Sequence, residues 1–267
     1  MRILVCVKQT PVSDKVSVDE KTGCLIRDGV ESAINPFDEF ALEEAVRTKE
    51  KLPGSTVVAL TMGPPQAETV LRECIARGAD SGYHLCDRAF AGSDTWATSY
   101  ALSLAIRKIA ETGGPIGLVF CGKQTNDSDT GHIGQQIATW LDWPGAAFIR
   151  KIEHVDENLV RVERSMEDGC DVLEMPLPAV LSVTKEISNP RIASLKGRLA
   201  AKKAVITKFG PADIGADPAK LGPASPTSVI RCFTPPKKAS AAVRIEGADA
   251  REKAARLARI LKEAKAF

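Results

Sequence analysis

The first 145 residues alternate between short apolar runs and longer segments of helical periodicity, and this alternation constrains the fold more than any other feature of the chain. Short apolar runs bounded by polar residues are typical of strands that a parallel sheet buries on both faces. Strands that alternate with helices form such sheets through right-handed crossovers. The pattern therefore predicts an α/β fold with a doubly wound parallel sheet. The predicted strands are 3–7, 56–62, 84–86 and 116–120.

The helical segments carry start and stop signals. Asn35 is the predicted N-cap of the first helix, with Pro36 at its first position and Asp38 in its first turn, where a carboxylate faces the positive end of the helix dipole. Pro53 and Gly54 are expected to end that helix. Further helices are predicted over 64–78, 94–109 and 132–141.

The pattern changes after residue 145. Segments 146–155, 158–166 and 170–184 alternate between apolar and polar residues, which is typical of antiparallel strands with one buried face. We therefore expect an antiparallel β segment added to the parallel sheet.

The C-terminal part has a different composition. A basic stretch at 195–206 precedes residues 207–240, which are rich in Pro, Gly and Ala and show no convincing period. A segment of that length without regular structure is unusual inside a compact domain, so it is either disordered or laid across a partner. A charged helix is predicted over 249–265. The predicted division is an α/β domain at 1–206 and an extended arm with a terminal helix at 207–267.

Composition argues against several classes of protein. The 267 residues are 44% hydrophobic, as in ordinary globular proteins, and the formal net charge of +2 is too small to indicate a nucleic-acid partner. No apolar run approaches the length of about 18 residues that a membrane span needs, and the N-terminal run is too short for a signal peptide. The seven cysteines show no CxxC spacing, which favours reduced thiols. We therefore expect a cytoplasmic protein without membrane insertion or bound nucleic acid.

Polar loops follow the predicted strands at the end of the sheet where ligands bind, beyond the carboxyl ends of the strands. Two of them, 87–95 and 122–133, are rich in small hydrogen-bonding residues and lead into predicted helix N-termini, which suit a phosphate. Neither the GxGxxG dinucleotide fingerprint nor a P-loop occurs. The residues alone therefore predict a nucleotide-like phosphate ligand and leave its identity open.

Several segments at these positions resemble the β subunit of electron transfer flavoprotein. The resemblance runs from residue 2 to about residue 240. It implies a Rossmann-like, adenine-nucleotide-binding fold and pairing with an α subunit that carries a redox-active FAD. In this family the β subunit holds either a structural AMP or, in electron-bifurcating members, a second FAD. The segments include VCVKQTP (5–11), NPFDEFALEEA (35–45), DRAFAGSDTWATS (87–99), GKQTNDSDTGHIGQ (122–135) and NPRIASLKGRLAAKK (189–203).

The resemblance implies an adenylate pocket. The loop after the fourth strand is expected to wrap the phosphate, and the helix that begins near Gly131 is expected to point N–H groups at it. Asp127 and Asp129 suit a phosphate poorly, so we expect them to hold the loop through Asx-type bonds to backbone N–H groups. The expected contacts are Cys6, Asn35, Pro36, Phe37, Asp38, Met62, Gly122, Lys123, Gln124, Thr125, Asn126, Asp127, Asp129, Thr130, Gly131, His132 and Ile133.

The segment DRAFAGSDTWATS is similar to that of electron-bifurcating members, in which it lies along the extra flavin. We therefore expect FAD in this chain, with AMP as the alternative. Gly92 would permit close backbone approach, and the Thr95 and Thr98 hydroxyls would face a pyrophosphate or ribityl chain. The expected contacts here are Ala89, Phe90, Gly92, Asp94, Thr95 and Thr98.

With FAD bound, the resemblance implies that NADH reduces this flavin. One electron then passes to a low-potential acceptor such as ferredoxin or flavodoxin, and the other passes through the α-subunit FAD to a dehydrogenase of the acyl-CoA type. The cofactor supplies this chemistry, so no catalytic side chain and no metal are expected. With AMP instead, the chain would be a non-bifurcating β subunit.

Residues 189–203 resemble the family's recognition loop, whose exposed leucine docks on the partner dehydrogenase. That leucine is Leu195 here, on a basic loop that we expect to be mobile. The arm at 207–240 is expected to wrap the α subunit.

Several residues of chemical interest are given structural roles. Cys6 is expected to be a small core residue whose adenosine contact is made by backbone. His132 is expected to face solvent at the start of a helix, and Trp96 and Tyr100 are expected to lie in the core.

Two other classes of protein remain as alternatives. A stand-alone adenine-nucleotide enzyme would need a metal-binding carboxylate and a glycine-serine phosphate loop after the first strand, where this chain has KQTPVSD (8–14). A stress-type nucleotide-binding homodimer would end near residue 145.

Overall fold

The computed structural model describes residues 1–12, 31–227 and 242–266. The chain divides into two compact units, Met1–Cys232 and Phe233–Phe267. The part of the predicted arm at 228–240 and the cysteines at positions 24 and 232 lie outside the described residues.

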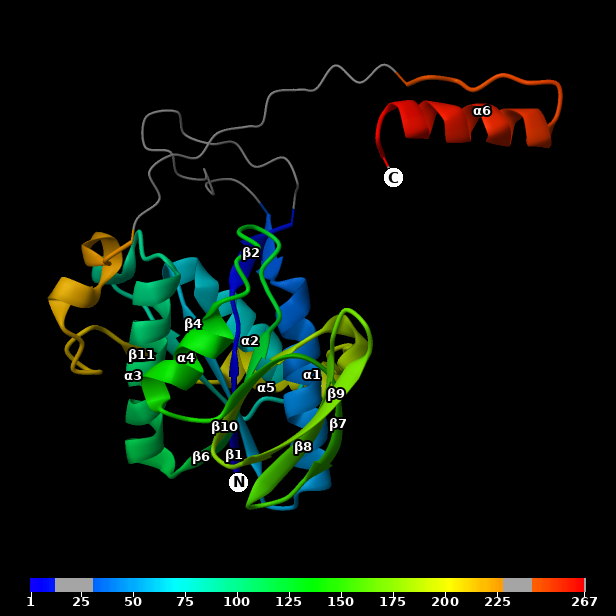
Figure 1. Ribbon diagram of the computed structural model, residues 1–267. Coiled ribbons are helices and arrows are strands. Elements are labelled where there is room, and N and C mark those ends of the chain that lie inside the picture. Colours follow the sequence, from blue (N-terminus) through cyan, green and yellow to red (C-terminus); the bar gives the residue numbers. More distant parts are fainter. Residues whose placement is uncertain (13–30, 228–241, 267) are drawn as a thin grey trace. The chain divides into compact units, whose positions relative to one another are not determined.

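Within the described part of the first unit, nine strands form one sheet in the order β11-β5-β4-β1-β6-β10-β7-β8-β9 (Figure 1). The strands from β11 to β7 run parallel, and β8 and β9 continue the sheet antiparallel. The strands β2 and β3 form a separate antiparallel ribbon. This confirms the predicted doubly wound α/β fold with an antiparallel addition. The bounds are β1 Arg2–Cys6, β2 Gln9–Pro11, β3 Ser32–Ile34, β4 Thr56–Met62, β5 Ser81–Leu85, β6 Ile116–Gly122, β7 Gly145–Val155, β8 Leu159–Ser165, β9 Cys170–Pro176, β10 Ala179–Val183 and β11 Ile206–Phe209.

The prediction of antiparallel strands throughout 170–184 is wrong in its second half. The strand β9 is antiparallel to β8, but β10 turns back into the parallel sheet, between β6 and β7, with Val183 opposite Gly122. All residues of β10 are buried, as a central parallel strand requires. Only Ser182 interrupts its apolar run, so the alternation that predicted an antiparallel strand does not extend to it.

Helices cover both faces of the sheet. On one face α1 and α2 pack against Ile3 and Val5, and on the other face α3 and α4 pack against Leu4. Alternate residues of one strand thus enter opposite halves of the core, as the period of a strand requires. The bounds are α1 Pro36–Lys51, α2 Glu68–Ala76, α3 Thr95–Gly113, α4 Ile133–Leu141, α5 Leu195–Lys203 and α6 Ala250–Glu263.

Most helix starts follow their predicted signals. Asn35 holds the N-cap position of α1 and Pro36 its first position, and Asp94 caps α3 by accepting from the Ala97 N–H (3.0 Å). The helix α2 begins later than predicted, because a 3-10 turn at Pro65–Ala67 precedes it.

Residues 206–227 are more regular than predicted. The strand β11 adds to the edge of the sheet beside β5, so the predicted domain boundary at residue 206 falls at the start of a strand. Two 3-10 turns follow at Pro218–Lys220 and Gly222–Ala224, and the Asp217 N–H donates to the Tyr100 hydroxyl (3.2 Å). Only the two ends of β11 are apolar, which is too short a pattern to predict a strand.

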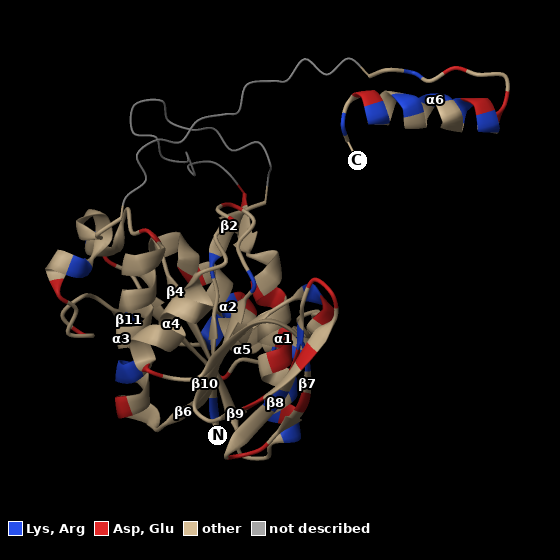
Figure 2. Ribbon diagram, viewed as in Figure 1, with Lys and Arg blue, Asp and Glu red and all other residues tan. Residues whose placement is uncertain are grey.

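The second unit contains the predicted C-terminal helix, α6. Asp249 caps it by accepting from the Glu252 N–H (2.8 Å), and none of its residues is buried within the described chain. Lys, Arg and Glu positions recur along its length, coloured blue and red in Figure 2. None of the described helices combines the length and the apolar character needed to cross a membrane.

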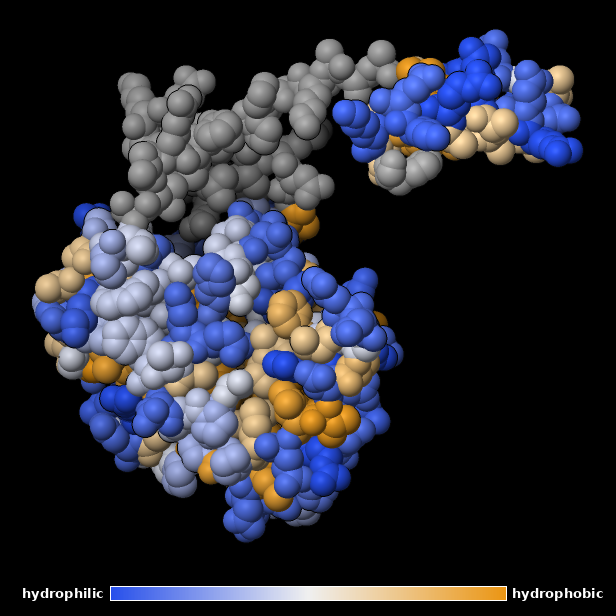
Figure 3. Space-filling view, in the orientation of Figure 1, coloured by the Kyte–Doolittle hydropathy of each residue, from blue (hydrophilic) through white to orange (hydrophobic). Residues whose placement is uncertain are grey.

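Apolar surface gathers over the antiparallel extension β7–β9, seen as orange atoms in Figure 3. The exposed large apolar residues of these strands and their connections are Phe148, Met166 and Val172. Phe148 has a left-handed backbone (φ 59°), which is rare for a bulky residue. The Nζ atom of Lys123, from the loop after β6, lies 5.4 Å from the centroid of its ring.

Candidate functional site

The order of strands reverses beside β1, so the reversal lies at the carboxyl ends of β1 and β6; we call this edge of the sheet the crevice. From β1 the chain passes to β4 and β5 on one side, and then returns to β6 on the other side. Ligands of open α/β sheets bind at such a reversal. The loop after β6 lies beside β2 at this end of the sheet (Figure 1), where Asn126 Nδ2 donates to the Pro11 carbonyl (3.3 Å).

Asn35 fastens the loop after β6 to the start of α1. Its buried side chain donates from Nδ2 to the Gln124 carbonyl (2.9 Å), and its Oδ1 accepts from the Asn126 N–H (3.2 Å). Asn35 holds the predicted N-cap position of α1, but its side chain makes no capping hydrogen bond. A capping oxygen must face its own helix, whereas here the amide bridges two segments.

Gly122 ends β6 against the start of α1, where no side chain fits. A Cβ there would lie 2.8 Å from the Phe37 carbonyl carbon and 2.9 Å from the Asp38 nitrogen, and it would also strike Asp38 Oδ1. Asp38 is 5% exposed, and its Oδ2 accepts from the Lys8 N–H (2.8 Å). Burial raises the pKa of Asp38 to about 7, against hydrogen bonds from Lys8, Asn35 and Gly122 that lower it.

Lys8 and Asp127 form an ion pair between the segment after β1 and the loop after β6. The Lys8 Nζ atom lies 2.7 Å from Oδ1 and 2.9 Å from Oδ2 of Asp127. Asp129 accepts from the side-chain amide of Gln124. Both carboxylates therefore hold the loop, as predicted. Their partners in these bonds are side chains, whereas bonds to backbone N–H groups were predicted.

Two residues with left-handed backbone turn the loop into α4. Asp129 has a φ of 55° and Gly131 a φ of 68°, and the Asp129 N–H donates to the Thr125 carbonyl (2.9 Å). His132 stands at the N-cap position, exposed as predicted, and its side chain makes no capping bond. The first N–H groups of α4 thus have no side-chain cap, and such groups together with the helix dipole attract anions.

Other predicted contacts lie around this crevice. Cys6 ends β1 as a buried core residue, and a hydrogen bond to its thiol, together with burial, raises the pKa of Cys121 on β6. Met62 ends β4 and is partly buried against the cluster that includes α3 and α4. Pro36 and Thr130 are exposed, and Phe37, Lys123, Thr125 and Ile133 are half-buried.

The segment 87–98 packs on a later part of the same chain. Asp94 accepts from the Ser225 hydroxyl (2.8 Å to each oxygen) and from the Thr227 hydroxyl. Gly92, with a φ of 75°, lies against the ring of Pro223. The Asp94 carboxylate therefore faces its helix and the arm. Phe90 is buried, Ala89 is exposed, and Thr95 and Thr98 are half-buried.

Sequence reasoning missed two residues of the site. Lys8 lies two residues beyond the end of β1; the sequence places it in a segment that faces the ligand, but it was not predicted as a contact. Gln136, in the first turn of α4, donates from Nε2 to the Thr95 hydroxyl (3.4 Å) and so connects the two predicted cofactor segments; nothing in the sequence distinguishes it from its neighbour Gln135. No group of three or more metal-ligating side chains occurs among the described residues.

The predicted recognition loop is largely a helix, α5. Ser194 caps it by accepting from the Gly197 N–H (3.0 Å), and the Arg72 guanidinium donates to the Ala201 carbonyl near its other end (2.7 Å). The expectation of a mobile loop is therefore wrong for 195–203. Only Ala201 of α5 is buried, so the sequence shows no apolar face from which to predict a helix.

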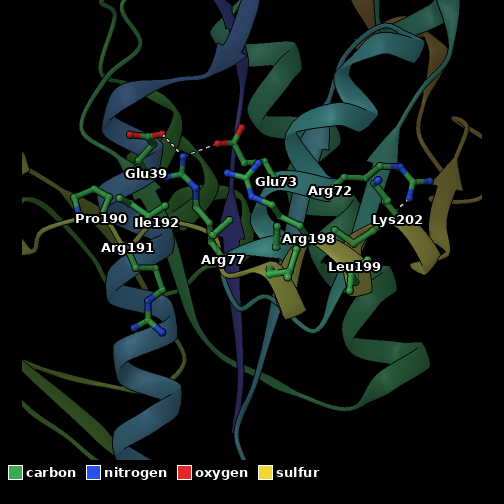
Figure 4. Close-up of a pocket in the computed structure, with 14 residues that line it drawn as sticks. Glu39, Arg72, Glu73, Arg77, Pro190, Arg191, Ile192, Arg198, Leu199 and Lys202 are labelled. Carbon is green, nitrogen blue, oxygen red and sulfur yellow. Dashed lines mark hydrogen bonds and ion pairs between the residues drawn. The ribbon is translucent and has the colours of Figure 1, made fainter.

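A groove of about 650 Å³ lies between α2, α5 and the segment that leads into α5 (Figure 4). Arg77 lies along it, paired with Glu39 (2.8 Å) and Glu73 (2.5 Å). Leu195 is 76% exposed at the start of α5, and Ile192 is 89% exposed. Leu195, the residue predicted to dock on the dehydrogenase, is thus an exposed apolar side chain beside charged side chains.

Arg191 clamps this segment on α1. Its Nε and Nη2 atoms donate to Glu43 (2.8 and 3.0 Å), and its Nη1 donates to Glu50 (2.6 Å). These bonds raise the pKa of Arg191 and lower that of Glu50. The helix α1 therefore begins at the crevice. Farther along it carries Glu43 and Glu50, which hold the docking segment through Arg191.

Comparison with known proteins places the chain in a family. A family model described as "Electron transfer flavoprotein domain" matches residues 22–214. The "Caffeyl-CoA reductase-Etf complex subunit CarD" of Acetobacterium woodii is 45% identical over 264 residues, 98% of each chain. The "Electron transfer flavoprotein subunit beta" of Thermoanaerobacterium thermosaccharolyticum is 46% identical over 237 residues, 88% of each chain. "Protein FixA" of Bradyrhizobium diazoefficiens is 41% identical over 253 residues, 93% of this chain and 88% of the relative. The chain therefore belongs to the electron transfer flavoprotein family, as a chain of the β-subunit type.

Proposed function

We propose that this chain is the β subunit of an electron-bifurcating electron transfer flavoprotein and holds FAD in the crevice between β1 and β6. It takes part in electron transfer between NADH, the FAD of an α subunit, a low-potential acceptor such as ferredoxin or flavodoxin, and a dehydrogenase of the acyl-CoA type. The observation that carries the proposal is the loop after β6, tied by Asn35 to α1 and leading into a helix N-terminus without a side-chain cap.

The residues of the crevice fit an adenosine phosphate. The N–H groups of the first turn of α4 would bind the phosphate, and Gly131 lets the backbone turn toward it without a side chain. Lys8 and Asp127 neutralise each other, so this pair adds no net charge beside the amide hydrogens. Bound FAD supplies the redox chemistry, while this chain binds and orients it.

Two surfaces suit the protein partners. Leu195 and Ile192 would enter apolar pockets of the dehydrogenase, and the Arg198 and Lys202 side chains beside them favour an acidic rim on that partner. The similarity to a subunit named for a complex with caffeyl-CoA reductase supports a partner that acts on CoA esters. Residues 207–267, which include α6, would contact the α subunit.

A structural AMP is the second candidate for this site, and one observation favours it. Asp94 is occupied by the Ser225 and Thr227 hydroxyls, and Gly92 packs on Pro223, so part of the segment expected to face the flavin is already covered. An AMP-holding β subunit would transfer electrons through the α-subunit FAD alone.

Counting nucleotides in the purified heterodimer with its α subunit tests the proposal. We expect two FAD and no AMP per heterodimer, measured by chromatography of the released cofactors. One FAD and one AMP would establish the non-bifurcating alternative, and one FAD with no second nucleotide would contradict a nucleotide site in this chain.

A further inference from the structure

The first turn of α4 contains two buried amide atoms without partners. Among the described residues, four shielded side-chain polar atoms have no hydrogen-bond partner: Thr48 Oγ1, His84 Nδ1, Gln135 Nε2 and Gln136 Oε1. Thr48 lies on α1 and His84 on β5, but the two glutamines are consecutive and lie where α4 leaves the crevice. Buried polar groups are nearly always paired, so an unpaired one at a ligand-binding edge indicates a partner that is not part of the chain.

Gln136 is the one of the two that faces the second cofactor segment. Its Nε2 donates to the hydroxyl of Thr95, the first residue of α3. The helices α3 and α4 are also joined farther along, where Trp140 Nε1 donates to the Ser99 hydroxyl (3.2 Å). The Gln136 amide therefore lies between the N-termini of two helices that pack side by side.

One polar atom of the Gln136 amide is left unpaired in either orientation of the amide group. The Thr95 hydroxyl can accept from a nitrogen or donate to an oxygen, so it satisfies either face of the Gln136 amide. Whichever way the amide is turned, one of its two polar atoms remains shielded and without a partner.

We infer that Gln136 is a cofactor-contacting residue that selects FAD over AMP. Its unpaired amide atom forms a hydrogen bond with the part of FAD beyond adenosine monophosphate, the second phosphate or the ribityl hydroxyls. The loop after β6 accounts for the adenylate, and Thr95 belongs to the segment assigned to the rest of the cofactor, so the bridging amide lies beside the part that AMP lacks. The inference rests on the proposed function, because it requires FAD in this crevice.

Binding of FAD and of AMP to the full-length chain, measured separately by equilibrium dialysis, tests the inference. Gln136→Leu keeps the size of the side chain and removes its polar atoms. We expect its Kd for FAD to rise about tenfold, as for the loss of one buried hydrogen bond, and its Kd for AMP to change less than about twofold. Gln135→Leu is the matched control, because the Gln135 side chain lies toward Gly145 of β7, where a Cβ would be 3.4 Å from its Oε1, and the bond to Thr95 belongs to Gln136; it should change neither Kd by more than about twofold.

A second measurement avoids the variant altogether. In the wild-type chain, the side-chain amide signals of Gln136 in a nitrogen-15 NMR spectrum should shift when FAD is added and stay in place when AMP is added. Equal loss of FAD and AMP affinity in Gln136→Leu, or unchanged affinity for both, would overturn the inference, as would an unshifted amide signal with FAD bound. The proposed function would fail if the wild-type chain bound AMP but not FAD. If the wild-type chain binds FAD and only the predicted effects at Gln136 are missing, the inference about Gln136 fails alone.

Discussion

Lys8 and Asp127 pair across the crevice, with Nζ 2.7 Å from Oδ1, and so join the segment after β1 to the loop after β6. The Asp127 side chain is 4% exposed and that of Lys8 is 35% exposed, so water reaches the pair mainly from the lysine side. The loop proposed to hold a phosphate is thus fixed both by this charge pair and by the Asn35 amide.

Asp127→Asn would leave the Lys8 ammonium without its counter-charge in a partly shielded position. We expect the free energy of unfolding, measured by urea denaturation, to fall by about 2 kcal/mol. The matched control is Glu174→Gln, which breaks a pair with Arg161 between exposed side chains of β8 and β9 and should cost less than about 1 kcal/mol. Equal losses in the two variants would contradict a structural role for the Lys8–Asp127 pair.

Asn35→Ala removes both hydrogen bonds that hold the loop after β6 against α1. We expect the Kd for AMP, measured by equilibrium dialysis on the full-length chain, to rise about tenfold because the loop loses its preorganisation. Asn158→Ala, at the exposed turn between β7 and β8, serves as control and should leave the Kd unchanged. Tight AMP binding by Asn35→Ala would show that the amide bridge does not shape the site.

Asp38 makes stability depend on pH. Its pKa in the folded chain is raised to about 7 from the usual value near 4, so between those values the folded state binds a proton that the unfolded state has lost. This group's contribution to stability is therefore present below about pH 4 and is lost as the pH rises to about 7. Asp38→Asn removes that titration.

The stability of Asp38→Asn relative to wild type should consequently improve as the pH rises from 4 to 7, by at most about 1.4 kcal/mol per pH unit, and level off above 7. Urea denaturation of both proteins across this range gives the difference directly. A difference that stays constant with pH would show that Asp38 is ionised in the folded chain throughout.

Gly122→Ala places a methyl group against the Phe37 carbonyl carbon and the Asp38 nitrogen. Because both neighbours are backbone of the first turn of α1, they cannot rotate away, and we expect a loss of about 2 kcal/mol or more in the free energy of unfolding. Gly169→Ala is the control, since no atom lies within 4 Å of a Cβ there. Comparable thermal midpoints for the two variants would contradict the close approach of β6 to α1.

Leu195→Ala tests the docking surface. The side chain is exposed at the start of a helix that is fixed at both ends, so its loss should not disturb the fold. We expect electron transfer to the dehydrogenase that co-purifies with the complex to slow about tenfold or more, with cofactor content unchanged. Val172→Ala, exposed on β9, is the control, and equal rates for the two variants would remove Leu195 from the docking surface.

The parallel core could be predicted because its signals are local. Buried apolar runs mark β1, β4 and β6, and the Asn-Pro and Asp signals mark the starts of α1 and α3. The place of β10 could not be predicted, because strand order depends on which partner buries its two faces, and a short apolar run contains no information about that choice. The helix α5 was missed for the opposite reason, since it is fixed by Arg72 and Ser194 and buries little of its own surface.

The candidate site was predicted as a set of segments, and its connections were not. The rule that ligands bind where strand order reverses selects the loop after β6. The sequence does not reveal that Asn35 bridges to Asn126, that Lys8 pairs with Asp127, or that Gln136 reaches Thr95, because each pair is separated by tens of residues and is brought together only by the sheet.

Amide hydrogen exchange of the full-length chain, with and without AMP or FAD, tests the central claim most directly. If the carboxyl edge between β1 and β6 holds the adenosine phosphate, the nucleotide should slow exchange in residues 122–137 and at the start of α1, and leave the antiparallel strands β8 and β9 unchanged. Nucleotide-dependent protection confined to other segments, or saturating nucleotide with no protection in 122–137, would contradict the account.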